Sequence, residues 1–323
     1  MRYVLYFIIV ILIIPIGFSG WAMLREHAVP EELAPTNGTF VDAGDVRLFV
    51  QTAGDDNNPP IIITHGMAAW SETWRKTIDV LADAGWYVVA VDMPPFGFSE
   101  RPHDKTYWRE SQAGRIAAII DTLDLDNAVL FAHSYGSRTA FETAMRYPER
   151  IRALVTVDPA LDGVYDDSNE TSSMPLLSHV LSVAPLRFAF VASTMTNPLL
   201  AKKFLQSFMH KTETATDEVV AVYQMPGALK GSTRDFGHWI LGFLRGEDTG
   251  YSRDRERYKN LPMPVIIIWG REDTTTPLSD GEALHAYIPN SELLVIDGVG
   301  HMPHIEDTAA FNELLVESLG ELQ

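Results

Sequence analysis

The amino-acid sequence predicts an α/β fold with a mostly parallel, doubly wound β-sheet. Short runs rich in Val, Ile and Leu alternate with helix-like segments in two parts of the chain, residues 39–158 and 260–323. These runs are apolar on both faces, which is typical of parallel strands covered by helices on both sides. The alternation stops in residues 159–259, so we expect this segment to be an insertion of short helices.

Composition limits the classes of protein to consider. The 323 residues are 46% hydrophobic and 21% charged, enough for one large globular domain with an insertion. A net charge of -18 argues against a nucleic-acid partner, because phosphate binding needs a basic face. The chain has no cysteine, so disulfides and cysteine-ligated metals are excluded. With no clustered metal ligands or phosphate-binding glycine loop, we expect no cofactor.

Residues 1–24 predict a transmembrane signal anchor. No charged residue occurs from Tyr3 to Leu24, and about twenty apolar residues in a helix span a ~30 Å hydrocarbon core. The run is longer than the apolar part of a typical signal peptide, although small residues beside Trp21 leave a cleaved signal and a secreted protein open. Arg2 lies before the run and acidic residues follow it, which favours an exported catalytic domain.

The first half of the sheet follows a linker. Residues 25–38 have two prolines and no periodic pattern, as linkers do. Residues 39–53 predict a hairpin, because alternating apolar and polar residues flank a turn. Residues 61–63 and 87–91 then read as buried strands, joined by a helix that ends at Gly85.

The remaining elements complete the sheet. Residues 114–123 have apolar side chains three and four apart, which predicts a helix. We expect strands at residues 128–132 and 153–157, then at 265–269 and 292–296, and a closing helix over 308–319. Because ligands bind beyond the carboxyl ends of parallel strands, the inserted helices are predicted to form a lid there.

Ser134 is the predicted nucleophile. It directly follows the strand of residues 128–132, and small residues, Ala132 and Gly136, lie two places to either side. Small neighbours suit the sharp strand-to-helix turn that exposes one hydroxyl in a strained conformation. A serine hydroxyl is a weak nucleophile at neutral pH, so it needs a base and an acidic group that orients the base.

Asp273 and His301 are predicted to supply that acid and that base. Each follows a predicted strand, and they come after the serine in the chain order that this topology requires. Glu272 and Asp158 remain alternatives for the acid, since both lie directly beyond strands. His304 is an alternative base, but it lies at the start of the last helix.

Two backbone N–H groups are expected to bind the substrate oxygen as negative charge builds on it. One belongs to Tyr135, the residue after the predicted nucleophile, and the other to Met67, in the loop after residues 61–63. Gly66 lets this loop approach closely, and we expect His65 to hydrogen-bond within the loop.

Five short motifs carry a resemblance to a known superfamily. They are His65–Met67, Asp92–Pro102, Ala132–Gly136, Gly270–Asp273 and Gly300–Pro303. On these motifs the chain resembles the α/β-hydrolase superfamily over roughly residues 39–319, and it is similar to the capped esterases, monoacylglycerol lipases and carbon–carbon hydrolases. The resemblance implies a Ser134, Asp273 and His301 triad. A serine nucleophile argues against the dehalogenases and epoxide hydrolases of the superfamily, which use aspartate.

The chain departs from the family pattern at two places, and neither touches the implied triad. Ala132 stands where glycine is usual, and Met93-Pro94-Pro95 replaces the more usual Leu-Pro-Gly, which should stiffen that loop.

Three functions follow from this pattern as hypotheses. The first is a serine hydrolase that cleaves an ester-like bond of a small apolar substrate through an acyl-enzyme, with aromatic residues of the lid around the substrate. The second is a carbon–carbon bond hydrolase, which needs a cation for an acidic substrate; Arg187 and Arg234 are candidates. The third is a catalytically silent binding protein on the same fold.

Overall fold

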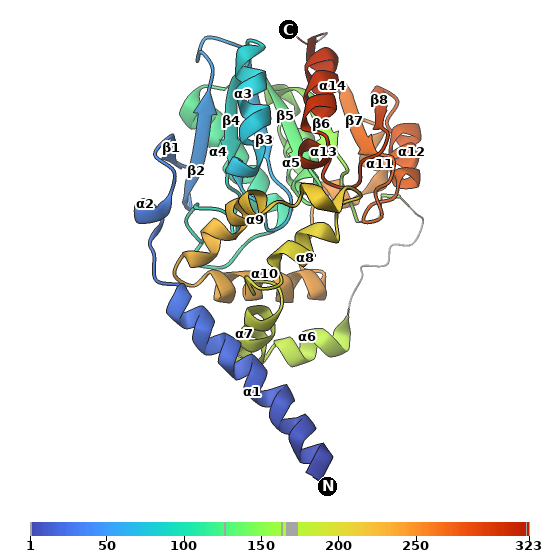
Figure 1. Ribbon diagram of the computed structural model, residues 1–323. Helices are drawn as coiled ribbons and strands as arrows, with labels where there is room; N and C mark the ends of the chain where they lie inside the picture. Colours follow the sequence, from blue (N-terminus) through green and yellow to red (C-terminus); the bar gives the residue numbers. More distant parts are fainter. Residues whose placement is uncertain (1, 126, 163, 166–173, 321, 323) are drawn as a thin grey trace.

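Eight strands among the described residues form one β-sheet. The computed structural model describes residues 2–125, 127–162, 164–165, 174–320 and 322, with side chains of the N-terminal helix from Ile14 onwards. The strand order is β1-β2-β4-β3-β5-β6-β7-β8 (Figure 1). β1 and β2 pair antiparallel, β2 pairs antiparallel with β4, and all other neighbours are parallel. The predicted α/β class is therefore confirmed.

The strands lie close to their predicted positions. They are β1 (Gly38–Asp42), β2 (Arg47–Ala53), β3 (Pro60–Thr64), β4 (Tyr87–Val91), β5 (Ala128–His133), β6 (Ile151–Val157), β7 (Val265–Gly270) and β8 (Ser291–Ile296). Alternate residues of β3 face opposite sides of the sheet: Ile62 belongs to one hydrophobic core, whereas Ile61 and Ile63 belong to the other. Both faces are thus buried, as continuous apolar strands require.

Helices cover each face of the sheet (Figure 1). On one face lie α3 (Arg75–Asp83) and α14 (Thr308–Gly320), whose apolar side chains pack in the core with Ile61. On the other lie α4 (Arg109–Leu123), α5 (Gly136–Arg146) and α12 (Leu278–Tyr287).

The start of α4 differs from the prediction. The helix begins at Arg109, before the predicted start at residue 114. Asp248, far along the chain, accepts hydrogen bonds of 2.9 Å from both the backbone N–H and the guanidinium of Arg109. This partner adds a turn that the apolar periodicity does not indicate.

The segment between β6 and β7 is helical where it is described. It contains α6 (Pro175–Leu181), α7 (Ala184–Ser193), α8 (Ala201–Gln206), α9 (Asp217–Gln224), α10 (Ser232–Arg245) and α11 (Arg255–Tyr258). Residues 163 and 166–173 of the predicted insertion lie outside the described residues. In Figure 1 these helices, apart from α11, lie between the sheet and the N-terminal helix.

The N-terminal helix α1 (Arg2–Arg25) is followed by a short helix α2 (Pro30–Leu33) and projects from the body in Figure 1. The predicted linker is held in place, because Ala28 pairs with Leu229 in an isolated β-bridge. Much of the predicted anchor lies outside the residues whose side chains are described. Within the described part of the chain, no single helix is long and apolar enough to cross a membrane, whereas the bent pair α6 and α7 passes that test on length and composition.

Candidate active site

Ser134 lies in a strained turn between β5 and α5. Its φ of 50° is in the left-handed region, which is unusual for a residue with a side chain. A methyl group on Gly136 would lie 2.5 Å from the carbonyl oxygen of His65, so only glycine fits there. The sheet fixes the turn as well, because the Ser134 N–H donates to the Val157 carbonyl oxygen at 2.9 Å. The hydroxyl is thereby presented beyond the carboxyl ends of the strands.

His301 joins Ser134 to Asp273. Its Nε2 lies 2.8 Å from the serine Oγ and its Nδ1 lies 2.6 Å from Asp273 Oδ2. The other carboxylate oxygen accepts the backbone N–H groups of Thr275 and Thr276 at 2.7 and 3.0 Å. Burial alone would raise the pKa of Asp273, but the hydrogen bonds from His301 and Thr276 lower it below its usual value. An ionised Asp273 holds the Nδ1–H tautomer, which leaves Nε2 free to accept the serine proton.

Neither Glu272 nor His304 takes part in this arrangement. The backbone N–H of Glu272 donates to Val299, and no hydrogen bond joins Glu272 to His301 among the described residues. The His304 ring stacks on Trp74 with a centroid separation of 3.8 Å. Burial holds the pKa of His304 well below its ordinary value, as suits a core side chain.

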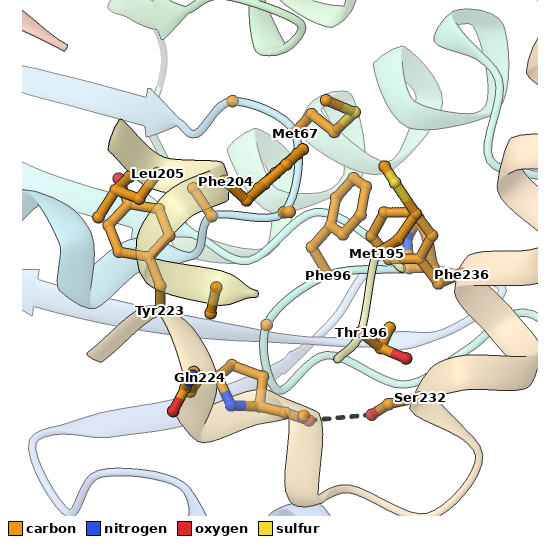
Figure 2. Close-up of a pocket in the computed structure, with 18 of the residues that line it drawn as sticks. Met67, Phe96, Met195, Thr196, Phe204, Leu205, Tyr223, Gln224, Ser232 and Phe236 are labelled. Carbon is orange, nitrogen blue, oxygen red and sulfur yellow. Dashed lines mark hydrogen bonds between the residues drawn. The ribbon is translucent and has the colours of Figure 1, made fainter. Parts of the chain in front are cut away.

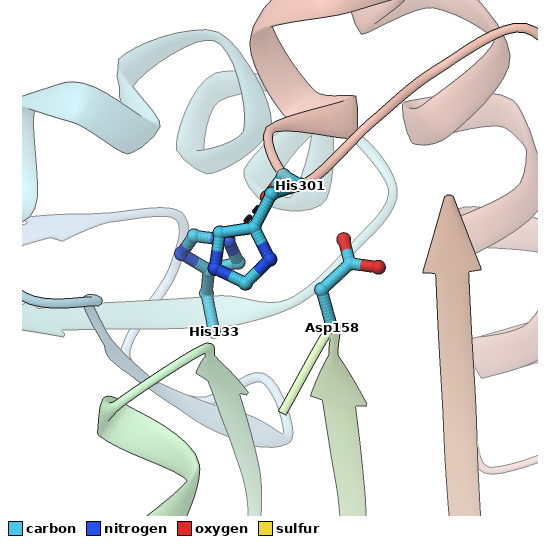
Figure 3. Close-up of side chains that lie close together, drawn as sticks. All are labelled: His133, Asp158 and His301. Atoms are coloured by element: carbon cyan, nitrogen blue, oxygen red, sulfur yellow. Dashed lines mark hydrogen bonds between the residues drawn. The ribbon is translucent and has the colours of Figure 1, made fainter. Parts of the chain in front are cut away.

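Asp158 lies beside His301 without replacing Asp273. Figure 3 shows it at the end of β6, and one of its carboxylate oxygens lies within 4.8 Å of ring nitrogens of His133 and His301. It is fully buried; Oδ1 accepts the Gly270 N–H at 2.8 Å, and Oδ2 has no hydrogen-bond partner among the described residues. Burial, reinforced by the nearby charge of Asp273, raises its pKa well above the usual value. Burial at the back of the site therefore disfavours the charged form of Asp158.

The trio of His133, Asp158 and His301 has the spacing of metal ligands, but His301 is already engaged on both ring nitrogens. Both ring nitrogens of His301 already bond Ser134 and Asp273. His133 Nε2 donates to the His301 carbonyl oxygen at 2.8 Å, and burial disfavours the charged form of Asp158 that would bind a cation. These residues therefore suit proton transfer better than binding of a cation.

Two neutral histidines brace the loops around Ser134. His65 Nδ1 donates to the Gly66 carbonyl oxygen at 2.8 Å, and its Nε2 accepts the Met93 N–H at 2.9 Å. Burial lowers the pKa of His65 to about 4 and that of His133 to about 3. The hydrogen bond from His133 to the His301 loop is not predicted from the sequence. The position of His133 directly before the nucleophile is the signal that could have indicated it.

The two predicted oxyanion donors flank the nucleophile. A methyl group on Gly66 would lie 3.3 Å from Ser134 Cβ, so the loop that carries Met67 passes directly beside the serine. Neither the Met67 nor the Tyr135 backbone N–H has an acceptor among the described residues. Both groups are thus available to a substrate oxygen, and their role stays a prediction.

A cavity of about 260 Å³ opens above Ser134 and His301. Its walls are largely apolar, as Figure 2 shows; they include Met67, Phe96, Met195, Phe204, Leu205 and Phe236. Of the aromatic residues expected around a substrate, Phe204 and Phe208 line it. This enclosure suits the apolar part of a small molecule.

The cations of the cavity are not those expected from the sequence. Arg187 is buried and donates to the Leu181 carbonyl oxygen at 2.8 Å, and the side chain of Arg234 is 60% exposed; neither lines the cavity. Arg25 and Arg101 line it instead. Arg101 donates to three carbonyl oxygens of its own loop, at Phe96, Gly97 and Ser99. Arg25 donates from Nη2 to the Thr196 carbonyl oxygen at 3.0 Å and lies 3.7 Å from Glu26 Oε1.

Comparison with known proteins identifies the family. A family profile described as alpha/beta hydrolase fold matches residues 59–308. The chain belongs to the α/β-hydrolase fold family. This α/β-hydrolase is 27% identical to the 2-hydroxymuconate semialdehyde hydrolase of Pseudomonas sp. strain CF600 over 292 residues, which covers 89% of this chain and 95% of that one. It is 25% identical to the 2-hydroxy-6-oxononadienedioate/2-hydroxy-6-oxononatrienedioate hydrolase of Burkholderia vietnamiensis, over 86% of this chain and 92% of that one.

A solved structure agrees with these relatives. The meta-cleavage product hydrolase from Pseudomonas fluorescens IP01 is 27% identical, with a TM-score of 0.72 over 88% of this chain and 98% of that one. The resemblance drawn from the five motifs is therefore confirmed, and the protein is a hydrolase.

Proposed function

We propose that this α/β-hydrolase cleaves its substrate through an acyl-enzyme formed on Ser134. The observation that carries the proposal is the chain of short contacts from Ser134 through His301 to Asp273, at the base of an apolar cavity. Ser134 Oγ attacks a carbonyl carbon while its proton passes to His301 Nε2, and the N–H groups of Met67 and Tyr135 bind the oxygen that gains charge.

We propose a carbon–carbon bond as the bond that is cleaved. Relatives that cover most of the chain are named for ring-cleavage products, and they support this hypothesis better than the ester hypothesis. As the carbon–carbon bond breaks, its electron pair passes to the conjugated fragment, which leaves as an enolate and takes the proton from His301. Water, deprotonated by the same histidine, then releases the acid from Ser134. Arg25 replaces Arg187 and Arg234 as the candidate cation for an acidic substrate group.

Ester hydrolysis is the second candidate function. Most side chains of the cavity wall are apolar, which suits an acyl chain as well as a conjugated fragment, and the same triad serves both reactions. We keep the remaining structural roles as proposals too. They are α1 as a membrane anchor with an exported catalytic domain, and the helices between β6 and β7 as a lid over the cavity.

One experiment separates these functions. Purified full-length protein in detergent is assayed with a conjugated ring-cleavage product, and the reaction is measured as loss of the visible absorbance of that product. In parallel, the protein is assayed with p-nitrophenyl esters of graded acyl length. We expect turnover of the ring-cleavage product, and its abolition by Ser134→Ala. Turnover of esters alone would favour the second candidate. Undiminished turnover in Ser134→Ala would refute the acyl-enzyme on Ser134. No turnover of either substrate, together with failure of a fluorophosphonate probe to label Ser134, would favour the silent binding protein.

A further inference from the structure

Three helices at one end of the molecule carry exposed apolar side chains. We call this surface the apolar face; it consists of Ile16, Met23 and Leu24 on α1, Met174, Leu176 and Val180 at and on α6, and Val183 and Leu186 before and on α7. Leu24 and Leu176 are 80% and 82% exposed. Several large exposed apolar side chains on neighbouring helices indicate an interaction site.

The helices α6 and α7 of this face have almost no charged residues, although the chain as a whole is strongly acidic. From Met174 to Ser193 there is no Asp, Glu or Lys, and the single arginine, Arg187, is buried. The chain as a whole has a net charge of -18. An apolar and uncharged surface on a strongly acidic protein suits hydrocarbon, because charged side chains are costly at membrane depth.

The end of α1 is fastened to the inserted segment to which α6 and α7 belong. Glu26 Oε1 accepts the Thr233 N–H at 3.2 Å, and Ala28 exchanges backbone hydrogen bonds of 3.1 and 2.9 Å with Ala228 and Lys230. Arg25 adds its bond to Thr196. In Figure 1, α7 lies against α1, with α6 beside it. Wherever α1 enters a bilayer, these contacts therefore bring α6 and α7 to the same bilayer.

We infer that α6 and α7 lie in the interface of a lipid bilayer, as a second membrane contact beside α1. The inference rests on the proposed anchoring by α1 and adds a surface that the anchor alone does not require. The length and composition of the α6 and α7 pair, bent by 105°, agree with it. Because Arg25 and Thr196 line the catalytic cavity, one wall of that cavity then lies beside the lipid, and apolar substrates dissolved in the bilayer are the class that reaches it.

The absence of cysteine allows a direct test. Single-cysteine variants of the full chain, Leu176→Cys and Leu186→Cys, are labelled with an environment-sensitive fluorophore and reconstituted in phosphatidylcholine vesicles. Asp56→Cys, at an exposed turn beyond β2, is the matched control. We expect a blue shift of emission and quenching by brominated lipid at positions 176 and 186, and neither change at position 56.

The alternative outcomes are distinct. Vesicles that float with the protein but leave positions 176 and 186 unquenched would overturn the inference while keeping the anchor. A blue shift without lipid quenching, with disulfide cross-linking between unlabelled Leu176→Cys copies, would assign the face to a second copy and would also overturn it. Hydrolysis by each variant in detergent is measured separately, so that failure of the proposed catalytic function is recognised independently.

Discussion

Replacing Asp273 by asparagine tests the proton relay most directly. The structure dictates how the new amide is oriented, because the position of Oδ1 accepts two backbone N–H groups, from Thr275 and Thr276, which an NH₂ group cannot do. The amide NH₂ must then occupy the position of Oδ2, 2.6 Å from His301 Nδ1. It donates to Nδ1, so the histidine proton moves to Nε2, where it faces the Ser134 hydroxyl.

A histidine in this tautomer cannot accept the serine proton. We therefore expect Asp273→Asn to lower kcat/KM by about 10⁴-fold, the loss seen when the acid of another serine triad is changed in this way. That loss corresponds to about 5.5 kcal/mol in the activation free energy. The rate of fluorophosphonate labelling of Ser134 should fall in parallel, and it gives a readout that needs no knowledge of the substrate.

Asp158 supplies the matched control. It lies close to His301, but no hydrogen bond joins the two side chains among the described residues and burial disfavours the charged form of Asp158, so Asp158→Asn should keep kcat/KM within about tenfold of the parent value. Part of the rise in its pKa comes from the charge of Asp273. The Asp273→Asn variant removes that charge and lets Asp158 ionise more readily, so the double variant should be slower than Asp273→Asn alone. If Asp158→Asn were as slow as Asp273→Asn, Asp158 would be the acid and the assignment would be wrong.

Three further predictions concern the cavity, the turn and the buried titratable groups. Arg25→Gln should raise KM for acidic ring-cleavage products about tenfold or more and leave KM for neutral esters unchanged, whereas Arg234→Gln, outside the cavity, should change neither; equal effects of the two variants would remove Arg25 from substrate binding. Gly136→Ala should lower the free energy of unfolding in urea by about 1–3 kcal/mol, because its methyl group meets the His65 carbonyl, whereas Gly114→Ala, with nothing within 4 Å, should not destabilise. The free energy of unfolding should fall as pH drops from about 6.5 towards 4. The reason is that burial lowers the native pKa values of histidines, to about 4 for His65 and about 3 for His133, whereas the same histidines bind protons in the unfolded chain. Asp158 has the opposite sign: its raised pKa stabilises the fold at low pH, and that contribution is lost as pH rises above about 4, so Asp158→Asn should gain stability over the parent protein by up to about 1.4 kcal/mol per pH unit in that range.

The sheet could be predicted from the sequence because each strand is buried on both faces. Such strands are continuous apolar runs, and their boundaries are marked by turn residues, so β3 and β4 appear within a residue of their predicted positions. The start of α4 could not be predicted in this way. It depends on Asp248, which comes close to Arg109 only when the inserted segment folds against the sheet.

The difference between local patterns and contacts made only in the folded protein also explains which features of the site could be predicted. Ser134, Asp273 and His301 each follow a strand, and parallel strands bring their carboxyl ends to one edge, so sequence order alone indicates that they meet. The raised pKa of Asp158 carries no sequence signal, because it arises from complete burial beside another carboxylate.

The cavity wall is the part that depends least on local pattern. Arg25 is the first residue of the predicted linker, more than a hundred residues before the nucleophile, and periodicity links it to no strand. It reaches the cavity because Glu26 and Ala28 fasten the end of α1 to the inserted helices. A change in that junction, such as Glu26→Ala, should therefore alter substrate preference without touching the relay at His301. We therefore expect substrate preference in this hydrolase to depend on contacts between the N-terminal helix and the insertion, which lie outside the sheet that carries Ser134 and His301.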